Sequence, residues 1–180
     1  MFEGESTILK TRKERDSLGE LEVPEAAYYG IQTQRALCNF PVSGHRQRPD
    51  FIRAYVLVKK AAAFANMELG VLDQDRGNAI IAATDDVLAN LAGRYSDQFP
   101  VDIFQAGAGT SSNMNINEVL ANRALELLGR NRGNYGFLSP NDHVNMAQST
   151  NDTFPAASCI AIIFAADRLL GVLSSLSDAF

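Results

Sequence analysis

Apolar residues recur at three- and four-residue steps along most of the chain, which is the period of an amphipathic helix. Two such stretches predict helices over residues 51–69 and 73–91, and Gly70 and Gly93 are the stop signals that follow them. A third helix is expected to begin after a glycine-rich segment and to end at Gly129. The pattern therefore predicts a mainly α fold.

The last stretch, from residue 152 onward, has an apolar stripe without an obvious partner elsewhere in the chain. Its members are Ile160, Ile163, Phe164, Leu170, Leu173, Leu176 and Phe180. The stripe predicts a long helix that either joins a helical bundle or packs as an ordinary core helix, and periodicity alone does not identify its partner. We place a domain boundary before it, with an N-terminal helical domain over residues 1–148 and the beginning of a bundle domain over residues 149–180.

The remaining segments lack helical periodicity. Residues 1–11 are polar and are expected to be mobile, and residues 12–48 are expected to form a loop-rich arm because prolines and glycines interrupt them. Residues 131–139 are expected to form a turn, with one short strand pair around Tyr135 and Phe137.

Composition and charge narrow the class of protein. With 180 residues, 46% of them hydrophobic, the chain can build a core, and a net charge of −5 argues against nucleic acid as a partner. Cys38 and Cys159 have no metal or disulfide spacing, which fits a reducing cytoplasm. The first residues do not resemble a signal peptide, and no uninterrupted apolar run reaches the roughly 20 residues that span a bilayer. We expect a soluble cytoplasmic protein that does not enter a membrane.

Two polar clusters, residues 107–115 and 148–152, stand directly before apolar helical patterns. The start of a helix has unpaired backbone N–H groups and a partial positive charge, so it attracts anions. Hydroxyl-rich clusters at two helix starts are therefore candidate sites for the two carboxylates of a small dicarboxylic acid. The competing interpretation is plain helix capping, for which Ser, Thr, Asn and Asp are the usual residues. A nucleotide site is not expected, because no Gly-Lys-Ser/Thr follows the glycines.

Longer motifs run through the chain in a fixed order. They are RKERDSLG at residues 12–19, AYYGIQT at 27–33, DQFPVD at 97–102, GAGTSSNMN at 107–115, NEVLAN at 117–122, PNDHVN at 140–145 and QSTND at 148–152. In sequence and order they resemble the fumarase/aspartase superfamily over nearly the whole chain. The resemblance implies the N-terminal helical domain and the first bundle helix of that fold, and a lyase that acts on a small dicarboxylic or amino acid without a metal or organic cofactor.

Within the superfamily, the motifs resemble the aspartase branch more than the class II fumarase branch. The fumarase pattern has Ser-Gly-Thr-Gln where this chain has residues 108–111, and it has His where this chain has Ser139. Gln34 and residues 153–155 are more similar to the fumarase branch. The resemblance therefore implies elimination of ammonia from L-aspartate to give fumarate through an aci-carboxylate carbanion. The reversible hydration of fumarate to malate is the alternative reaction.

The resemblance also implies roles for individual residues. Thr110, Ser149 and Thr150 are expected to hold the β-carboxylate of the substrate. Thr110 and Asn151 are expected to lie near the leaving amino group, and Ser111 to help shape the first loop.

Other polar residues in the motifs receive weaker roles. Asn141 and Asp142 correspond to a possible second carboxylate site, which the serine at position 139 puts in doubt. His143 is expected to orient or cap its neighbours, and His45 lies in a loop, so neither histidine is assigned to catalysis.

The superfamily's catalytic serine, on a mobile loop, and its substrate-binding lysine belong to a part of the polypeptide that these 180 residues do not contain. We expect an N-terminal fragment with about half of one binding site and no general base, and hence no activity by itself. The superfamily assembles as homotetramers through its long helices, which implies that the full-length protein is a homotetramer. A non-catalytic structural member is the alternative from another class, and the presence of the substrate hydroxyls favours the enzyme.

Overall fold

The computed structural model describes residues 10–180, and the residues before them, which were expected to be mobile, lie outside the described residues. Its elements in chain order are β1 (Thr11–Asp16), β2 (Gly19–Pro24), α1 (Ile31–Asn39), α2 (Pro49–Glu68), α3 (Gln74–Ala89), α4 (Thr110–Leu127), the π-helical turn η1 (Pro140–Val144) and α5 (Thr150–Asp178). The mainly α fold is confirmed, and α2, α3 and α4 begin and end close to the residues that the apolar pattern predicts.

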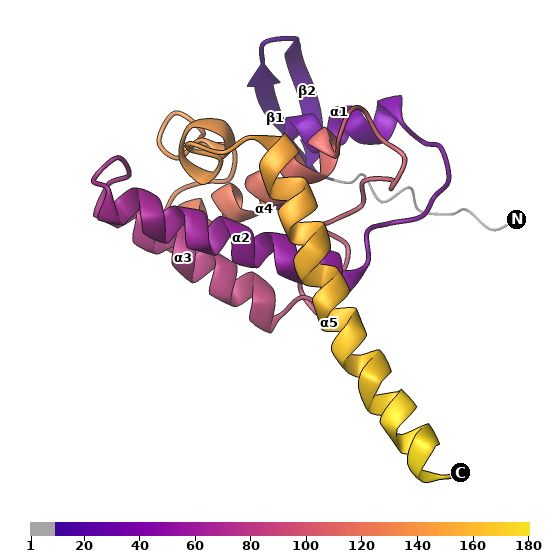
Figure 1. Cartoon of the computed structure of the whole chain (residues 1–180). Coiled ribbons are helices and arrows are strands. Elements are labelled where there is room, and N and C mark those ends of the chain that lie inside the picture. The colour runs from indigo at the N-terminus through magenta and orange to yellow at the C-terminus, as the bar shows by residue number, and fades with distance from the viewer. Residues whose placement is uncertain (1–9) are drawn as a thin grey trace, which may run out of the picture.

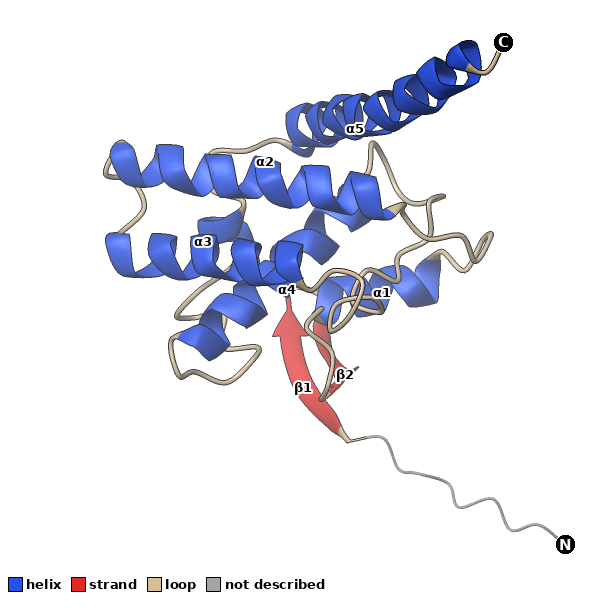
Figure 2. Cartoon of the chain, turned by 90° about the horizontal axis from the view of Figure 1, so that it is seen from below, coloured by secondary structure: helices blue, strands red, loops and turns tan. Residues whose placement is uncertain are grey.

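Helices α2 and α3 form a hairpin of two helices that lie side by side (Figure 2). Helix α2 ends where Gly70 adopts a positive φ of 69°, which glycine tolerates better than other residues. Helix α3 begins after Asp73, whose carboxylate accepts the Arg76 N–H at 3.0 Å and so caps the helix. These two local signals set the short connection between the helices.

Helix α4 lies at the centre of the molecule, packed against α1, α3 and η1 (Figure 1). One part of its surface is apolar and contributes Val119, Leu120 and Leu125 to the main core. A second part is polar and equally buried, and it consists of Asn113, Asn115, Asn117, Glu118 and Asn122, each at most 2% exposed. A buried polar group is tolerated only when it is hydrogen-bonded, so these side chains determine what packs around the helix.

The arm before α2 is more ordered than the loop-rich segment that the sequence predicts, so that expectation was wrong. Strands β1 and β2 form an antiparallel hairpin, and α1 follows it. The Arg12 guanidinium donates hydrogen bonds to the carbonyl oxygens of Pro24, Ala27 and Tyr29. The Glu118 carboxylate of α4 accepts three backbone N–H groups at the start of α1, at 2.8 to 3.0 Å. These charged groups hold the arm together with a small apolar cluster of Val23, Ala27 and Ile31.

The segment after α4 forms turns, as expected, but the strand pair around Tyr135 and Phe137 is absent from the part of the chain that the structure describes. The Tyr135 hydroxyl accepts a hydrogen bond from Asn122 at 2.9 Å. The Phe137 ring is in contact with two guanidinium groups, those of Arg76 and Arg130, at 4.7 and 4.3 Å from its centroid. The aromatic residues that suggested strands instead anchor the turns to helices.

Helix α5 packs on α2 through its first turns and then extends away from the body of the molecule (Figure 1). Thr153 and Ala157 are buried in this contact, and Phe164 packs against its edge. Beyond it the large apolar side chains are exposed, namely Ile162, Ile163, Leu169, Leu170, Val172, Leu173, Leu176 and Phe180. The protruding part of the stripe thus has no partner within residues 10–180.

By length and composition alone, α5 is also apolar enough to cross a membrane, with a mean hydropathy of 1.9 over its most apolar window. The sequence expectation concerned uninterrupted apolar runs, and Asp167 and Arg168 interrupt this one. Core helices of soluble proteins pass the same test. The Arg168 guanidinium is bound by the Asp50 carboxylate of α2 at 2.5 and 3.0 Å, which places this part of the helix beside a charged surface.

Gly109 offers a direct test of how α4 meets α5. It has a φ of 90°, and a Cβ atom added to it would lie 2.0 Å from the Phe154 ring. Gly129 has a φ of 69° but open space around it. We expect Gly129→Ala to lower the free energy of unfolding by about 1 kcal/mol through backbone strain alone, and Gly109→Ala to lower it by about 3 kcal/mol because overpacking is added. Urea unfolding measures both values, and equal losses would contradict the contact.

Candidate active site

The starts of α4 and α5, which contain the two polar clusters, lie against each other. Gly109 precedes α4 and abuts the Phe154 ring in the first turns of α5. One turn into α4, the Asn113 side-chain amide donates a hydrogen bond to the Thr150 hydroxyl at 2.9 Å. Two positively polarised helix starts are thereby brought to one place, which is the arrangement that the charge of a dicarboxylate requires.

Four of the five predicted substrate-binding residues belong to this place. Thr110 is exposed at the start of α4, while Ser149 and Asn151 are exposed at the start of α5 and Thr150 is half-buried between them. The Ser149 hydroxyl accepts the Asn151 backbone N–H at 3.2 Å, so it caps α5 in the ordinary way. Capping uses one lone pair of that hydroxyl and leaves its O–H free to donate to an anion.

Ser111, the fifth residue, faces a different part of the molecule. It is half-buried and lines a separate cavity of about 250 Å³ on the side of α1, together with Asp16 and Arg35. Arg35 is already ion-paired with Asp16 at 2.8 Å. The structure therefore does not bring Ser111 together with Thr150.

The possible second carboxylate site is an exposed turn. Asn141 and Asp142 are exposed on η1, and their side chains make no hydrogen bond within residues 10–180. The Ser139 hydroxyl accepts the backbone N–H groups of both residues, at 3.2 and 3.1 Å. The Nδ1 atom of His143 accepts the Ser139 N–H at 2.8 Å, and burial, together with the nearby Arg76 charge, lowers the pKa of His143. His143 thus takes a local structural part in this turn.

Beneath the two helix starts lies a buried polar network that the sequence analysis missed. The Lys59 ammonium of α2 donates to the side-chain oxygens of Asn145 and Gln148 at 2.8 and 3.0 Å. The same Asn145 oxygen accepts the Asn113 amide at 3.1 Å, which connects the lysine to Thr150. Lys59 is fully buried, and burial lowers its pKa to about 7.

A signal for Lys59 was present in the sequence. The residue stands three and four positions from Val56, Tyr55 and Ala63, which form the buried face of α2. A lysine on an apolar helix face is uncommon unless its charge has a specific role or partner. The adjacent Lys60, which pairs with Asp85 on α3, shows the ordinary surface arrangement.

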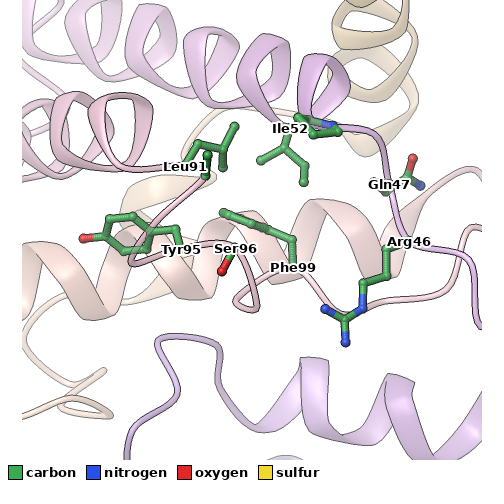
Figure 3. Close-up of a pocket in the computed structure, with 9 residues that line it drawn as sticks. Arg46, Gln47, Ile52, Leu91, Tyr95, Ser96 and Phe99 are labelled. Carbon is green, nitrogen blue, oxygen red and sulfur yellow. The ribbon is translucent and has the colours of Figure 1, made fainter.

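An apolar cavity of about 230 Å³ elsewhere in the molecule is not this site. It lies between the beginning of α2 and the loop after α3, where Ile52 and Leu91 face the rings of Tyr95 and Phe99 (Figure 3). No residue of the two polar clusters lines it. Its one charged side chain, Arg46, is exposed and pairs with Asp97. The chemistry therefore points to the helix starts rather than to this cavity.

Comparison with known proteins places the chain in a family. A family model described as lyase matches residues 19–180. The chain belongs to this lyase family. The match includes both polar clusters and the helices that carry them.

Individual relatives of this lyase differ in the reaction that their names state. The chain is 52% identical to aspartate ammonia-lyase from a Bacillus species, over 94% of this chain and 36% of that protein. It is also 52% identical to class II fumarate hydratase from Halobacterium salinarum, over 94% of this chain and 37% of that protein. The crystal structure of fumarate lyase:delta crystallin from Brucella melitensis matches with a TM-score of 0.87 and 51% identity, over 92% of this chain and 38% of that one.

The chain therefore spans little more than a third of the length of the curated relatives it matches. Overall identity does not distinguish the two reactions, because relatives with either name reach the same value. The substrate must be argued from the residues of the site.

Titration of Lys59 is expected to make stability depend on pH. The unfolded chain binds a proton at Lys59 below its ordinary pKa of 10.5, whereas the folded chain binds it only below about 7. The unfolded state holds more protons between these values, so the free energy of unfolding rises with pH, by about 3 kcal/mol at most from about pH 7 to pH 9.5. Lys59→Met should flatten this rise in urea unfolding, while Lys60→Met keeps it. A Lys59→Met variant with the wild-type slope would refute the assignment.

Proposed function

We propose that the complete protein is an aspartate ammonia-lyase, which reversibly eliminates ammonia from L-aspartate to give fumarate. The observation that carries the proposal is the hydrogen bond that joins the starts of α4 and α5 through Asn113 and Thr150. It gathers hydroxyls and helix-start N–H groups where one carboxylate of the substrate would be held. The resemblance of residues 108–111 and Ser139 to the aspartase branch supports ammonia as the leaving group.

The proposed elimination requires a site that stabilises the negative charge as it develops on the substrate. Removal of the proton beside the β-carboxylate creates an aci-carboxylate dianion, and donors placed where this charge develops lower the barrier. In this proposal Thr110, Ser149 and Thr150 supply those donors. Asn151, at the second position of α5, lies near the leaving amino group. The general base comes from a part of the protein beyond these residues.

Class II fumarase is the second candidate. The identity to the Halobacterium salinarum fumarate hydratase supports it, as do Gln34 and the stretch 153–155. Both reactions pass through a similar carbanion, so the donors at the two helix starts serve either one. The leaving group is what separates the two candidates. A non-catalytic member with the same fold is a third possibility that the turnover test below addresses.

The exposed stripe of α5 belongs to the same proposal. We propose that residues 149–180 begin a bundle domain in which copies of this helix pack together in a cytoplasmic homotetramer. The large apolar side chains on the protruding part of α5 support this, because such a surface is seldom left exposed to water. Residues 1–148 then form the domain that supports the site.

Turnover by the complete gene product tests the function. We expect fumarate to appear, by its ultraviolet absorbance, when L-aspartate is offered and not when L-malate is offered. Residues 1–180 alone should give no turnover, because the proposed base is not among them. Turnover of malate alone would make the protein a fumarase, and turnover of neither substrate would favour a non-catalytic role.

A pair of Thr→Val variants tests the role of the Thr150 hydroxyl in the same turnover assay. Thr150→Val keeps the shape of the side chain and should lower kcat/KM roughly 100-fold, as expected for loss of one donor to the developing charge. Thr84→Val removes a buried hydroxyl on α3 that donates only to the Ile81 carbonyl, and it should leave kcat/KM nearly unchanged. Equal effects of the two changes would show that Thr150 acts through stability.

Association of the 180-residue chain tests the assembly. Light scattering should show oligomers whose size falls to that of a monomer when Leu169, Leu173 and Leu176 are all replaced by Glu. Gly171→Glu and Ser175→Glu introduce charge on the face of the same helix opposite Leu173 and should leave association unchanged. A wild-type chain that stays monomeric at high concentration would contradict the proposed bundle.

A further inference from the structure

The Lys59 ammonium is a buried cation without an anionic partner. It is 0% exposed, and no ion pair within residues 10–180 includes it. Its hydrogen bonds go to two neutral amide oxygens, those of Asn145 and Gln148, and it lies 5.3 Å from the centroid of the Tyr55 ring. A buried charge is costly unless it is paired, so a counter-charge nearby would stabilise it.

Both hydrogen-bond acceptors of the Lys59 ammonium belong to the segment that connects to the candidate active site. Asn145 accepts the Asn113 amide, and that amide also donates to Thr150 at the start of α5, through links of 3.1 and 2.9 Å. Gln148 stands directly before the cap of α5, and its side-chain amide donates to the Val144 carbonyl at 2.9 Å. The ammonium therefore fixes the orientation of the segment that presents the start of α5.

Among the described residues, no other side chain bonded to Lys59 or to its two amide acceptors titrates near neutral pH. Glu118 of α4, whose pKa burial raises to about 7, bonds instead to the N–H groups at the start of α1. His143 of η1 bonds to the Ser139 N–H. Helix α2 itself presents Tyr55, whose pKa burial raises to about 12 and whose hydroxyl bonds with Thr153 of α5. The segment after η1 presents the amides of Asn145 and Gln148, and α4 presents the amide of Asn117, which also reaches Asn145. Any proton exchanged in this network near neutral pH belongs to the lysine.

A dicarboxylate at the two helix starts would supply the missing counter-charge. Three hydrogen bonds of 2.8, 3.1 and 2.9 Å join the Lys59 ammonium to the Thr150 hydroxyl, through the Asn145 oxygen and the Asn113 amide. A carboxylate bound at that hydroxyl would attract the ammonium across a partly buried path, where charges are screened less than in bulk water. Charge on the lysine favours the bound anion, and by linkage the bound anion favours charge on the lysine.

We propose that Lys59 is a positioning residue of the active site and that it takes up a proton when a dicarboxylate binds at the starts of α4 and α5. This inference rests on the function proposed above. Binding and protonation then strengthen each other, so affinity for the dicarboxylate falls as pH rises above neutrality.

Calorimetry with succinate, a dicarboxylate that cannot undergo elimination, tests the inference on the complete gene product. The heat of binding is measured near pH 8 in two buffers with different ionisation enthalpies, which gives the number of protons taken up. We expect uptake of about one proton per bound succinate near pH 8 and little uptake near pH 6, where the lysine is already charged. Succinate that binds without proton uptake near pH 8 overturns the inference but not the proposed function.

Three variants assign the proton to its residue. Lys59→Met should abolish the uptake and weaken succinate binding at least about tenfold, the loss expected for a nearby charge. Lys60→Met removes a charge from the adjacent position and should change neither quantity. Lys59→Arg keeps a permanent cation, so it should bind succinate with no proton uptake. Uptake that persists in Lys59→Met overturns the inference.

The wild-type result does not depend on whether a variant folds. Nuclear magnetic resonance of the lysine side chains in the wild-type protein provides a second measurement, in which one lysine titrates near neutral pH and its pKa rises when succinate is added. An unchanged titration of that lysine with bound succinate overturns the inference. If succinate does not bind at all, the proposed function fails and the inference fails with it.

Discussion

The fold depends on the burial of a helix that is as polar as it is apolar. The apolar side of α4 joins the main core, but its asparagines and Glu118 are buried too, and each must be hydrogen-bonded to something. The Asn115 amide donates to the Gln98 carbonyl, and the Asn122 amide donates to the Tyr28 carbonyl. The Glu118 carboxylate accepts backbone N–H groups at the start of α1. The helix therefore fixes several otherwise irregular segments in place by directional bonds.

The same helix connects two buried charges of opposite sign. Burial raises the pKa of Glu118 to about 7, against the N–H groups that favour its charged form, and burial lowers the pKa of Lys59 to about 7. The Glu118 carboxylate binds the arm through the N–H groups at the start of α1. The Lys59 ammonium and the Asn113 amide both donate to the Asn145 oxygen, which connects the lysine to the start of α5. Within residues 10–180 neither charge is bonded to a partner of opposite charge, so backbone and amide dipoles stabilise both. The stability of this centre and the shape of the site thus rest on the same set of hydrogen bonds.

The parts of the fold that the sequence predicts are those in which one local signal dominates. Helices α2, α3 and α4 have apolar periodicity, and the ends of α2 and α4 are followed by Gly70 and Gly129. Helix α3 ends at Ala89, before the predicted stop at Gly93, and the α5 start has the cap residues of its cluster. The arm was missed because Arg12 and Glu118 hold it, and charged residues in a polar stretch usually indicate a solvated loop. Lys59 was missed although it lies on the apolar face of α2, because its helical position predicts burial but not the contact with Asn145 that ties it to the site.

The choice between aspartate and malate depends on fewer residues than the choice of family. The donors proposed at the two helix starts would suit any dicarboxylate whose carbanion they stabilise, and relatives of either name match this chain at the same identity. Ser139 lies where the fumarase pattern has His, and its hydroxyl is occupied by the N–H groups of Asn141 and Asp142. Its O–H remains free to donate, so this bonding alone does not distinguish the two reactions. The proposal of an ammonia-lyase therefore rests on the residue types at positions 108–111 and 139 rather than on overall identity.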